Sequence, residues 1–209
     1  MNTAIPEALA ESPLLRVGGY DVFEGMLDGG MVRALLAEAL QQRSLAQESH
    51  VLVDDGEEVR GGSPARRFLS ATGGEAQDAF YQSPWLAGFL GQLAGMPAVP
   101  TGDQGTYSYY VRPGDYLALH RDIETCDVAV ISCLYDGPAS EEGGGLRLYP
   151  GRIEEPLSEI RRDQEAGAVG LRLRPGQTLV LLGGLVPHEV LPIADGQRRI
   201  VSVLCFRAG

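Results

Sequence analysis

From about residue 107 to residue 206 the chain consists of short runs rich in β-forming residues, separated by turns rich in glycine and proline. The runs cover residues 107–111, 116–119, 128–135, 146–149, 178–182, 186–193 and 200–206. Runs this short, at this spacing, are typical of a β-sandwich or barrel and not of alternating β–α–β units. We therefore expect a mainly β core in about residues 101–209.

The first hundred residues predict helices beside this β-structure. Residues 26–46 carry apolar side chains near helical spacing, and Asp28 is placed to cap the N-terminus of such a helix. Residues 75–94 repeat the pattern, although Pro84 must begin or break a helix there. Residues 54–64 are charged and rich in glycine, which indicates an exposed loop. At 209 residues, we expect one domain with a helical part in about residues 1–100.

Charge and hydropathy exclude several classes of protein. Seventeen basic and 28 acidic residues give a formal net charge of −11, whereas a nucleic-acid surface needs clustered Lys and Arg. No stretch approaches the roughly 18 apolar residues that a membrane span requires. The first ten residues have no basic start followed by a long apolar run, so they do not resemble a signal peptide. We expect a cytoplasmic protein that binds neither nucleic acid nor membranes.

The three cysteines support the same location. Cys126, Cys133 and Cys205 form no C-x-x-C pair and lie in apolar runs. Such cysteines are interpreted as small buried side chains in a reducing compartment, not as disulfide partners.

Two histidines and an aspartate form a candidate metal site. His120 and Asp122 lie two residues apart at the end of a β-rich run, so both side chains point to the same face. His188 begins another such run and can supply a third ligand from across a barrel. Two imidazoles and one carboxylate on one face of an octahedron leave positions open, as Fe(II) oxygen chemistry requires.

Arg198 is the candidate for binding a carboxylate beside this site. Residues 186–206 predict a hairpin in which a three-residue turn pairs Ala194 with Arg198. Ala194 lies an even number of residues after His188, so the two side chains should point to the same face of the strand. Arg198, as the partner of Ala194, should then face the same interior. A guanidinium binds a carboxylate with two parallel hydrogen bonds, which suits Arg198 to this role. The neighbouring Arg199 is expected to be solvated.

With these residues in place, the second half of the chain resembles the Fe(II)/2-oxoglutarate-dependent dioxygenases, most closely their prolyl 4-hydroxylase-like branch. The resemblance covers residues 107–206 and includes the motifs Y-x5-Y-x3-H-x-D, R-P-G-Q-T-L-V-L-L and H-E-V-x-P-x5-R, which begin at Tyr110, Arg174 and His188. The family's Gly-Gly-Glu-Leu run is matched loosely, because Gly145 stands where the acidic residue is expected. It is also open whether Tyr135 replaces a family tyrosine that faces the cosubstrate.

The resemblance implies a double-stranded β-helix, or jelly-roll, core with N-terminal helices packed on it. It implies Fe(II) held by His120, Asp122 and His188, with 2-oxoglutarate bound by Arg198 and Tyr110. It also implies O2 as the oxidant, succinate and CO2 as products, and ascorbate as a reductant. Because Asp122 is present, hydroxylation is favoured over the halogenation carried out by relatives that lack this carboxylate.

The substrate is the least determined part of the prediction. Arg121, Glu124 and Arg147 are candidates for substrate contacts, although a solvated or structural role is favoured for each of them. Residues 150–168 predict a loop or short helix over the mouth of the site. With no repeat, peptide-binding appendage or basic groove, a free amino acid or natural-product intermediate is preferred as substrate. A prolyl or other side chain in a protein remains an alternative, and a cupin-like metal-binding protein without turnover is a second.

Overall fold

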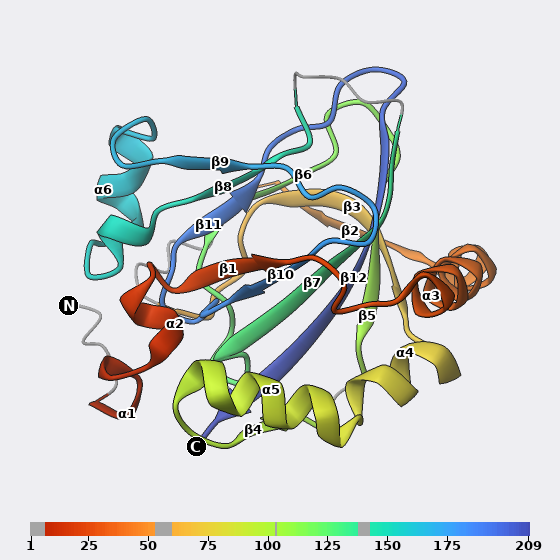
Figure 1. Ribbon diagram of the computed structural model, residues 1–209. Helices are drawn as coiled ribbons and strands as arrows, with labels where there is room; N and C mark the ends of the chain where they lie inside the picture. Colours follow the sequence, from red (N-terminus) through yellow and green to blue (C-terminus); the bar gives the residue numbers. More distant parts are fainter. Residues whose placement is uncertain (1–6, 53–59, 103, 138–142) are drawn as a thin grey trace.

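The computed structural model describes residues 7–52, 60–102, 104–137 and 143–209, and these form one curled sheet with helices on its outer surface (Figure 1). The loop predicted at residues 54–64 lies mostly outside the described residues. No helix within the described ranges is long and apolar enough to cross a membrane.

The helices of the first half lie close to where the sequence predicts them. The helical segments are α1 (Glu7–Ala10), α2 (Pro13–Arg16), α3 (Gly29–Gln42), η1 (Arg43–Leu45), α4 (Glu75–Tyr81), α5 (Pro84–Ala94), η2 (Pro150–Arg152) and α6 (Leu157–Arg162). Asp28 caps α3, since its carboxylate accepts a hydrogen bond from the Met31 amide at 2.7 Å. Pro84 is the first residue of α5, where its missing N–H costs nothing. Ser83 caps this helix.

The strands extend over both halves of the chain. They are β1 (Tyr20–Phe23), β2 (Gln47–Val51), β3 (Arg66–Thr72), β4 (Ala98–Pro100), β5 (Thr106–Tyr110), β6 (Tyr116–His120), β7 (Val128–Gly137), β8 (Leu146–Leu148), β9 (Val169–Leu171), β10 (Thr178–Leu181), β11 (His188–Val190) and β12 (Arg198–Ala208). The expected runs of the second half are all strands, but β1 to β4 come from the part expected to be helical. The N-terminal half therefore supplies part of the sheet as well as the helices outside it.

The sheet has the order β1-β10-β7-β12-β5-β3-β6-β11-β8-β9, with β2 paired to β3 and β4 paired to β12. All the strand pairs in the described residues are antiparallel. The predicted mainly β fold with flanking helices is confirmed.

Successive side chains of β5 point alternately to the outer face of the curled sheet, where the helices pack, and to its interior. Tyr107 and Tyr109 point outward, where their hydroxyls donate to Glu38 at 2.6 Å and to the Ala39 carbonyl at 2.7 Å on α3. Ser108 and the other residues of the opposite parity line an internal cavity. Because successive side chains of a strand point to opposite faces, the helices fix one face and leave the other for the site.

Candidate metal centre and its cavity

His120 and His188 are direct partners on neighbouring strands β6 and β11. Their ring centroids are 4.2 Å apart, and each Nδ1 lies 2.9 Å from a backbone oxygen, that of Ala118 or Val186. These bonds orient both Nε2 atoms toward Asp122, as metal-binding histidines require. His188 thus approaches from the adjacent strand, and not from across a barrel as the sequence suggested.

Asp122 follows the end of β6 and lies against a glycine. Its amide donates to the Gly183 carbonyl at 2.8 Å, and its Oδ1 lies 3.6 Å from His120 Nε2 and 3.7 Å from His188 Nε2. A Cβ on Gly183 would come within 1.8 Å of Asp122 Oδ2. Only glycine therefore allows this carboxylate to occupy its position. Sequence reasoning missed Gly183, although a Gly-Gly pair just before the His188 strand was a usable signal.

The charges of the cluster suit metal binding. Burial lowers the pKa of His188 to about 4, and the neighbouring His120 adds to this effect, so the imidazole is neutral at neutral pH. Burial alone would raise the pKa of Asp122, but His188, His120 and Arg60 outweigh it and lower that pKa. A neutral imidazole and an ionised carboxylate are the states in which His188 and Asp122 would ligate a metal. Ligand atoms of the three residues lie within 4.8 Å of one another, so the three predicted residues could hold one ion.

The cluster opens into a cavity of about 210 Å³. Its walls come from β3, β5, β6, β7, β8, β11 and β12 and are mostly apolar. The polar side chains that line it, apart from the cluster, are Ser70, Thr106, Ser108, Tyr110 and Arg199. An enclosed apolar space with a few convergent polar groups is the usual form of a small-molecule site.

Arg199, and not Arg198, points into this cavity. Arg199 is 2% exposed and donates a hydrogen bond to the Gly144 carbonyl, whereas Arg198 is exposed on the other face of β12. The predicted hairpin is wrong: β12 pairs with β5 and β7, while β11 pairs with β6 and β8. The alternation of inward and outward side chains counted from His188 therefore cannot be extended through residues 191–197 to Arg198.

Tyr110 lies opposite Arg199 in the β5–β12 register and lines the same cavity. Its side chain is buried, and burial raises the pKa of its phenol although the Arg199 charge opposes the shift. Tyr110 is thus a neutral hydroxyl beside a buried cation. Tyr135, in contrast, is 41% exposed and shares a surface pocket with Arg198.

Arg121 has a structural role. Its side chain is fully buried and donates to the carbonyls of Leu185 at 3.0 Å, Ile153 at 2.9 Å and Glu155 at 2.8 Å. The guanidinium thus ties residues 150–155 to the segment that leads into β11. It does not line the cavity.

The other two substrate candidates also lie away from the cavity. Glu124 is exposed in the turn that follows Asp122. Arg147 lies between two buried leucines on β8 and faces Glu189 at 3.6 Å and Glu165 at 3.4 Å. Neither residue belongs to the cavity lining, so the structure gives no support to these substrate contacts.

Residues 150–168 contain a short helix, as predicted, but not over the mouth of the cavity. Leu157 and Ile160 of α6 pack on Leu119 and Tyr149. Leu119 alternates with His120 on β6, so α6 covers the outer face of the strand that carries the ligand.

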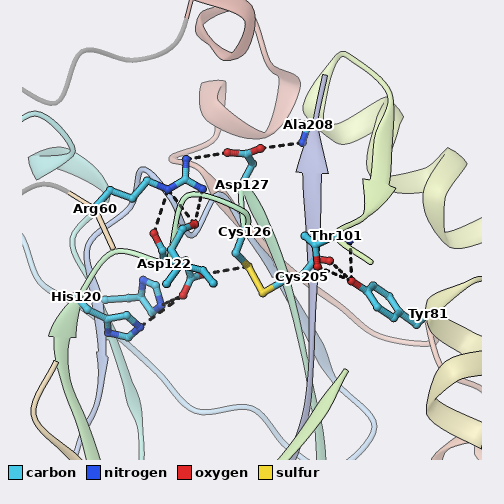
Figure 2. The surroundings of a disulfide bond; sticks show 11 residues. Arg60, Tyr81, Thr101, His120, Asp122, Cys126, Asp127, Cys205 and Ala208 are labelled. Atoms are coloured by element: carbon cyan, nitrogen blue, oxygen red, sulfur yellow. Dashed lines mark hydrogen bonds and ion pairs between the residues drawn. A yellow bond between two sulfur atoms is a disulfide. The ribbon is translucent and has the colours of Figure 1, made fainter. Parts of the chain in front are cut away.

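The interpretation of the cysteines was wrong for two of the three. Cys126 and Cys205, 79 residues apart in sequence, form a disulfide beside Asp122 (Figure 2). Cys133 is free and buried, as expected. The sequence gives little sign of this pair because neither cysteine is part of a recognisable spacing motif.

No family model matches the sequence, and no curated protein matches it. Solved structures do match. A Pseudomonas putida prolyl-4-hydroxylase is 22% identical, with a TM-score of 0.61 over 98% of this chain and 100% of that one. EctD from S. alaskensis, solved with 2-oxoglutarate and 5-hydroxyectoine, is 16% identical, with a TM-score of 0.68 over 100% and 83%.

A third similar structure is the epimerase SnoN in complex with Fe3+, alpha ketoglutarate and nogalamycin RO. It is 17% identical, with a TM-score of 0.67 over 91% of this chain and 79% of that one. At these identities the matches show the fold. The predicted resemblance to 2-oxoglutarate/Fe(II) oxygenases, including a prolyl hydroxylase-like structure, is confirmed at that level.

Proposed function

We propose that this protein is an Fe(II)- and 2-oxoglutarate-dependent dioxygenase that hydroxylates an unactivated C–H bond of a small molecule, with succinate and CO2 as coproducts. The observation that carries the proposal is the meeting of His120, Asp122 and His188 in a cavity that also contains the buried Arg199. A metal and a cation facing one enclosed space provide the two binding points that a 2-oxo diacid needs.

The donor set fits ferrous iron. The imidazoles of His120 and His188 and the carboxylate of Asp122 would hold the ion and leave room beside it for a 2-oxo acid. When bound, iron and 2-oxoglutarate supply the oxidising power that the amino acids lack. The chain's own contribution is to orient His120 and His188 through their Nδ1 contacts and to exclude water with apolar walls.

Arg199 is the residue that we assign to the far carboxylate of 2-oxoglutarate. Among the described residues no carboxylate forms an ion pair with it, and its guanidinium donates to the neutral Gly144 carbonyl. A buried cation without an anion is unfavourable, and a bound carboxylate would correct this. The Tyr110 hydroxyl, opposite on β5, is placed to bind the same group.

The cavity favours a neutral substrate. Once Arg199 and Tyr110 bind the cosubstrate, the polar side chains left among the described lining residues, apart from the metal ligands, are the hydroxyl-bearing Ser70, Thr106 and Ser108. A second carboxylate or an ammonium group would enter this space without a partner, at considerable cost. Within the earlier expectation, we therefore favour a natural-product intermediate over a free amino acid. The similar structures of EctD and SnoN are complexes with small molecules, 5-hydroxyectoine and nogalamycin RO.

A prolyl side chain in a protein is the second candidate, because a prolyl-4-hydroxylase covers nearly the whole chain with the same fold. The test begins with protein reconstituted anaerobically with Fe(II) and 2-oxoglutarate. It would be exposed to O2 in separate reactions with a panel of neutral metabolites, with free amino acids and with proline-containing peptides. Succinate and products heavier by 16 Da would be measured in each reaction. We expect coupled succinate and product with a neutral small molecule. Coupling with peptides alone would favour the prolyl alternative, and metal binding without succinate would favour the cupin-like one.

A further inference from the structure

The loop that joins β6 to β7 carries Asp122 at its start and is fastened to the end of β12. The Asp127 amide donates to the Phe206 carbonyl at 2.9 Å, and its carboxylate accepts from the Ala208 amide at 2.9 Å. The Cys126–Cys205 disulfide joins the same two segments covalently (Figure 2). The position of a candidate metal ligand thus depends on a crosslink to the C-terminal strand.

Arg60 holds the other side of this loop. Its guanidinium donates to the Asp122 carbonyl at 3.0 Å, to the Ile123 carbonyl at 2.7 Å and to Asp127 Oδ1 at 2.8 Å (Figure 2). These contacts fix the backbone of the loop. They do not touch the oxygens of the Asp122 carboxylate, whose orientation depends on what lies around the side chain.

The disulfide touches that carboxylate directly. Asp122 Oδ1 faces the two imidazoles, and Oδ2 lies 3.7 Å from Cys126 Sγ. A disulfide sulfur carries no hydrogen, so it leaves the charge on Oδ2 undiminished. In the reduced protein the same sulfur would be a thiol, which can donate a weak hydrogen bond to Oδ2 and turn the carboxylate away from the imidazoles.

We propose that the Cys126–Cys205 disulfide is a positioning element for the metal ligand Asp122, and that its reduction weakens metal binding. The inference rests on the proposed metal site and adds redox regulation to it. Reduction removes the covalent tie of the loop and introduces a donor at Oδ2, and both changes act against the ligating geometry. Partners that orient metal ligands typically alter metal affinity by 10- to 100-fold.

The chemistry is thiol–disulfide exchange with a small dithiol. A thiolate attacks Cys205 Sγ, because Cys205 is partly exposed while Cys126 is fully buried. The S–S bond breaks, and Cys126 leaves as a thiolate that takes up a proton. The second thiol of the reagent then displaces Cys205, so that one dithiol is oxidised to its cyclic disulfide and one protein disulfide is reduced to two thiols.

The test is a metal titration of both redox forms without cosubstrate or substrate. Anaerobic Co(II) binding would be followed by its absorption spectrum in oxidised protein and in protein treated with dithiothreitol and then freed of reagent. Alkylation and mass spectrometry would count the thiols in each sample. We expect one thiol in the oxidised form, three in the reduced form, and roughly tenfold weaker Co(II) binding after reduction.

Three variants separate positioning from general stabilisation. Cys205→Ala leaves the Cys126 thiol and should bind Co(II) as weakly as reduced protein, with no further response to dithiothreitol. Cys126→Ala/Cys205→Ala removes the tie without adding a donor and should fall between the two forms. Cys133→Ala keeps the disulfide and is the matched control, with unchanged affinity and an unchanged response to reduction.

Thermal unfolding of the same samples identifies a purely structural crosslink. A lower melting temperature with equal Co(II) affinity in both redox forms would overturn the proposal, and so would three free thiols after incubation with oxidised glutathione. If the oxidised protein binds Co(II) tightly but forms no succinate, the proposed function fails while the redox effect stands. If no form binds metal, both fail.

Discussion

Tyr110 and Arg199 lie directly opposite each other on β5 and β12, and both side chains line the cavity that contains His120, Asp122 and His188. A buried cation, a neutral phenol and a metal-binding cluster thus face one enclosed space. The neighbouring Arg198 lies outside it on the surface. This arrangement makes the two adjacent arginines a matched pair for testing which one binds 2-oxoglutarate.

Arg199→Ala should raise the KM for 2-oxoglutarate by about 100-fold, because truncating one partner of a buried charge pair leaves the other uncompensated. Arg199→Lys, which keeps the charge but loses the fork, should fall between wild type and Ala. The measurement is succinate formation against 2-oxoglutarate concentration. Arg198→Ala is the control and should change KM little; a large effect there with none at Arg199 would reverse the assignment.

Gly183→Ala should weaken metal binding by at least about tenfold, since the new Cβ would lie 1.8 Å from Asp122 Oδ2 and displace the carboxylate. The measurement is Co(II) affinity by anaerobic titration. Gly170→Ala is a suitable control, because a Cβ there meets no atom within 4 Å. Equal affinities in the two variants would show that the ligand does not depend on this close approach.

Arg121→Met should lower the free energy of unfolding by about 2–4 kcal/mol, because one buried and two partly buried carbonyls lose a charged donor. Urea denaturation monitors the loss. Arg207→Met, at an exposed position on β12, is the control and should change stability by less than about 0.5 kcal/mol. If Arg121 instead binds substrate, the variant would unfold like wild type and lose turnover.

Glu38→Gln should destabilise the protein most at neutral pH. Burial alone would raise the pKa of Glu38, but hydrogen bonds from Tyr107 and from the amides of Ala76, Gln77 and Gly74 outweigh it and lower the pKa below its ordinary 4.5. A lowered carboxylate pKa stabilises the fold above pH 4.5, and the contribution is lost as the pH falls through the lower value.

The measurement is urea denaturation of wild type and Glu38→Gln between pH 3 and pH 7. The difference should be about 1–2 kcal/mol at pH 7 and should shrink toward pH 3. Glu75→Gln is the control for a general charge effect, since Glu75 lies in the first turn of α4, the helix whose N-terminal amides donate to Glu38. A difference that does not change with pH would contradict the ionised, hydrogen-bonded Glu38.

Much of the fold could be predicted because its signals are local. Asp28 and Pro84 mark helix starts through the chemistry of their own side chains, and the strands of the second half have turns between them. The strands β2 and β3 were missed because their sequences, Gln47–Val51 and Arg66–Thr72, are largely polar or lack a fully buried face. Long-range pairing creates these strands, and no local pattern records it.

The candidate site divides in the same way. His120 and Asp122 could be predicted together because two residues of spacing fix a shared face within one strand. The prediction that Arg198 faces the site depended on a hairpin. Residues 191–197 instead lead to β12, which pairs with other strands, so the count of inward and outward side chains from His188 does not apply to it. The contact of Cys126 with Cys205 depends on tertiary packing across 79 residues, which spacing alone does not reveal.

The most direct test of the account is an anaerobic titration of the Fe(II)-loaded protein with 2-oxoglutarate, followed by absorption spectroscopy. We expect a saturable metal-to-ligand charge-transfer band in wild type. His188→Ala should lose both the band and iron-dependent succinate formation while keeping its fold by circular dichroism. Fe(II)-loaded wild type without such a band, or His188→Ala with undiminished turnover, would contradict the proposal that His120, Asp122 and His188 hold the iron that binds the cosubstrate.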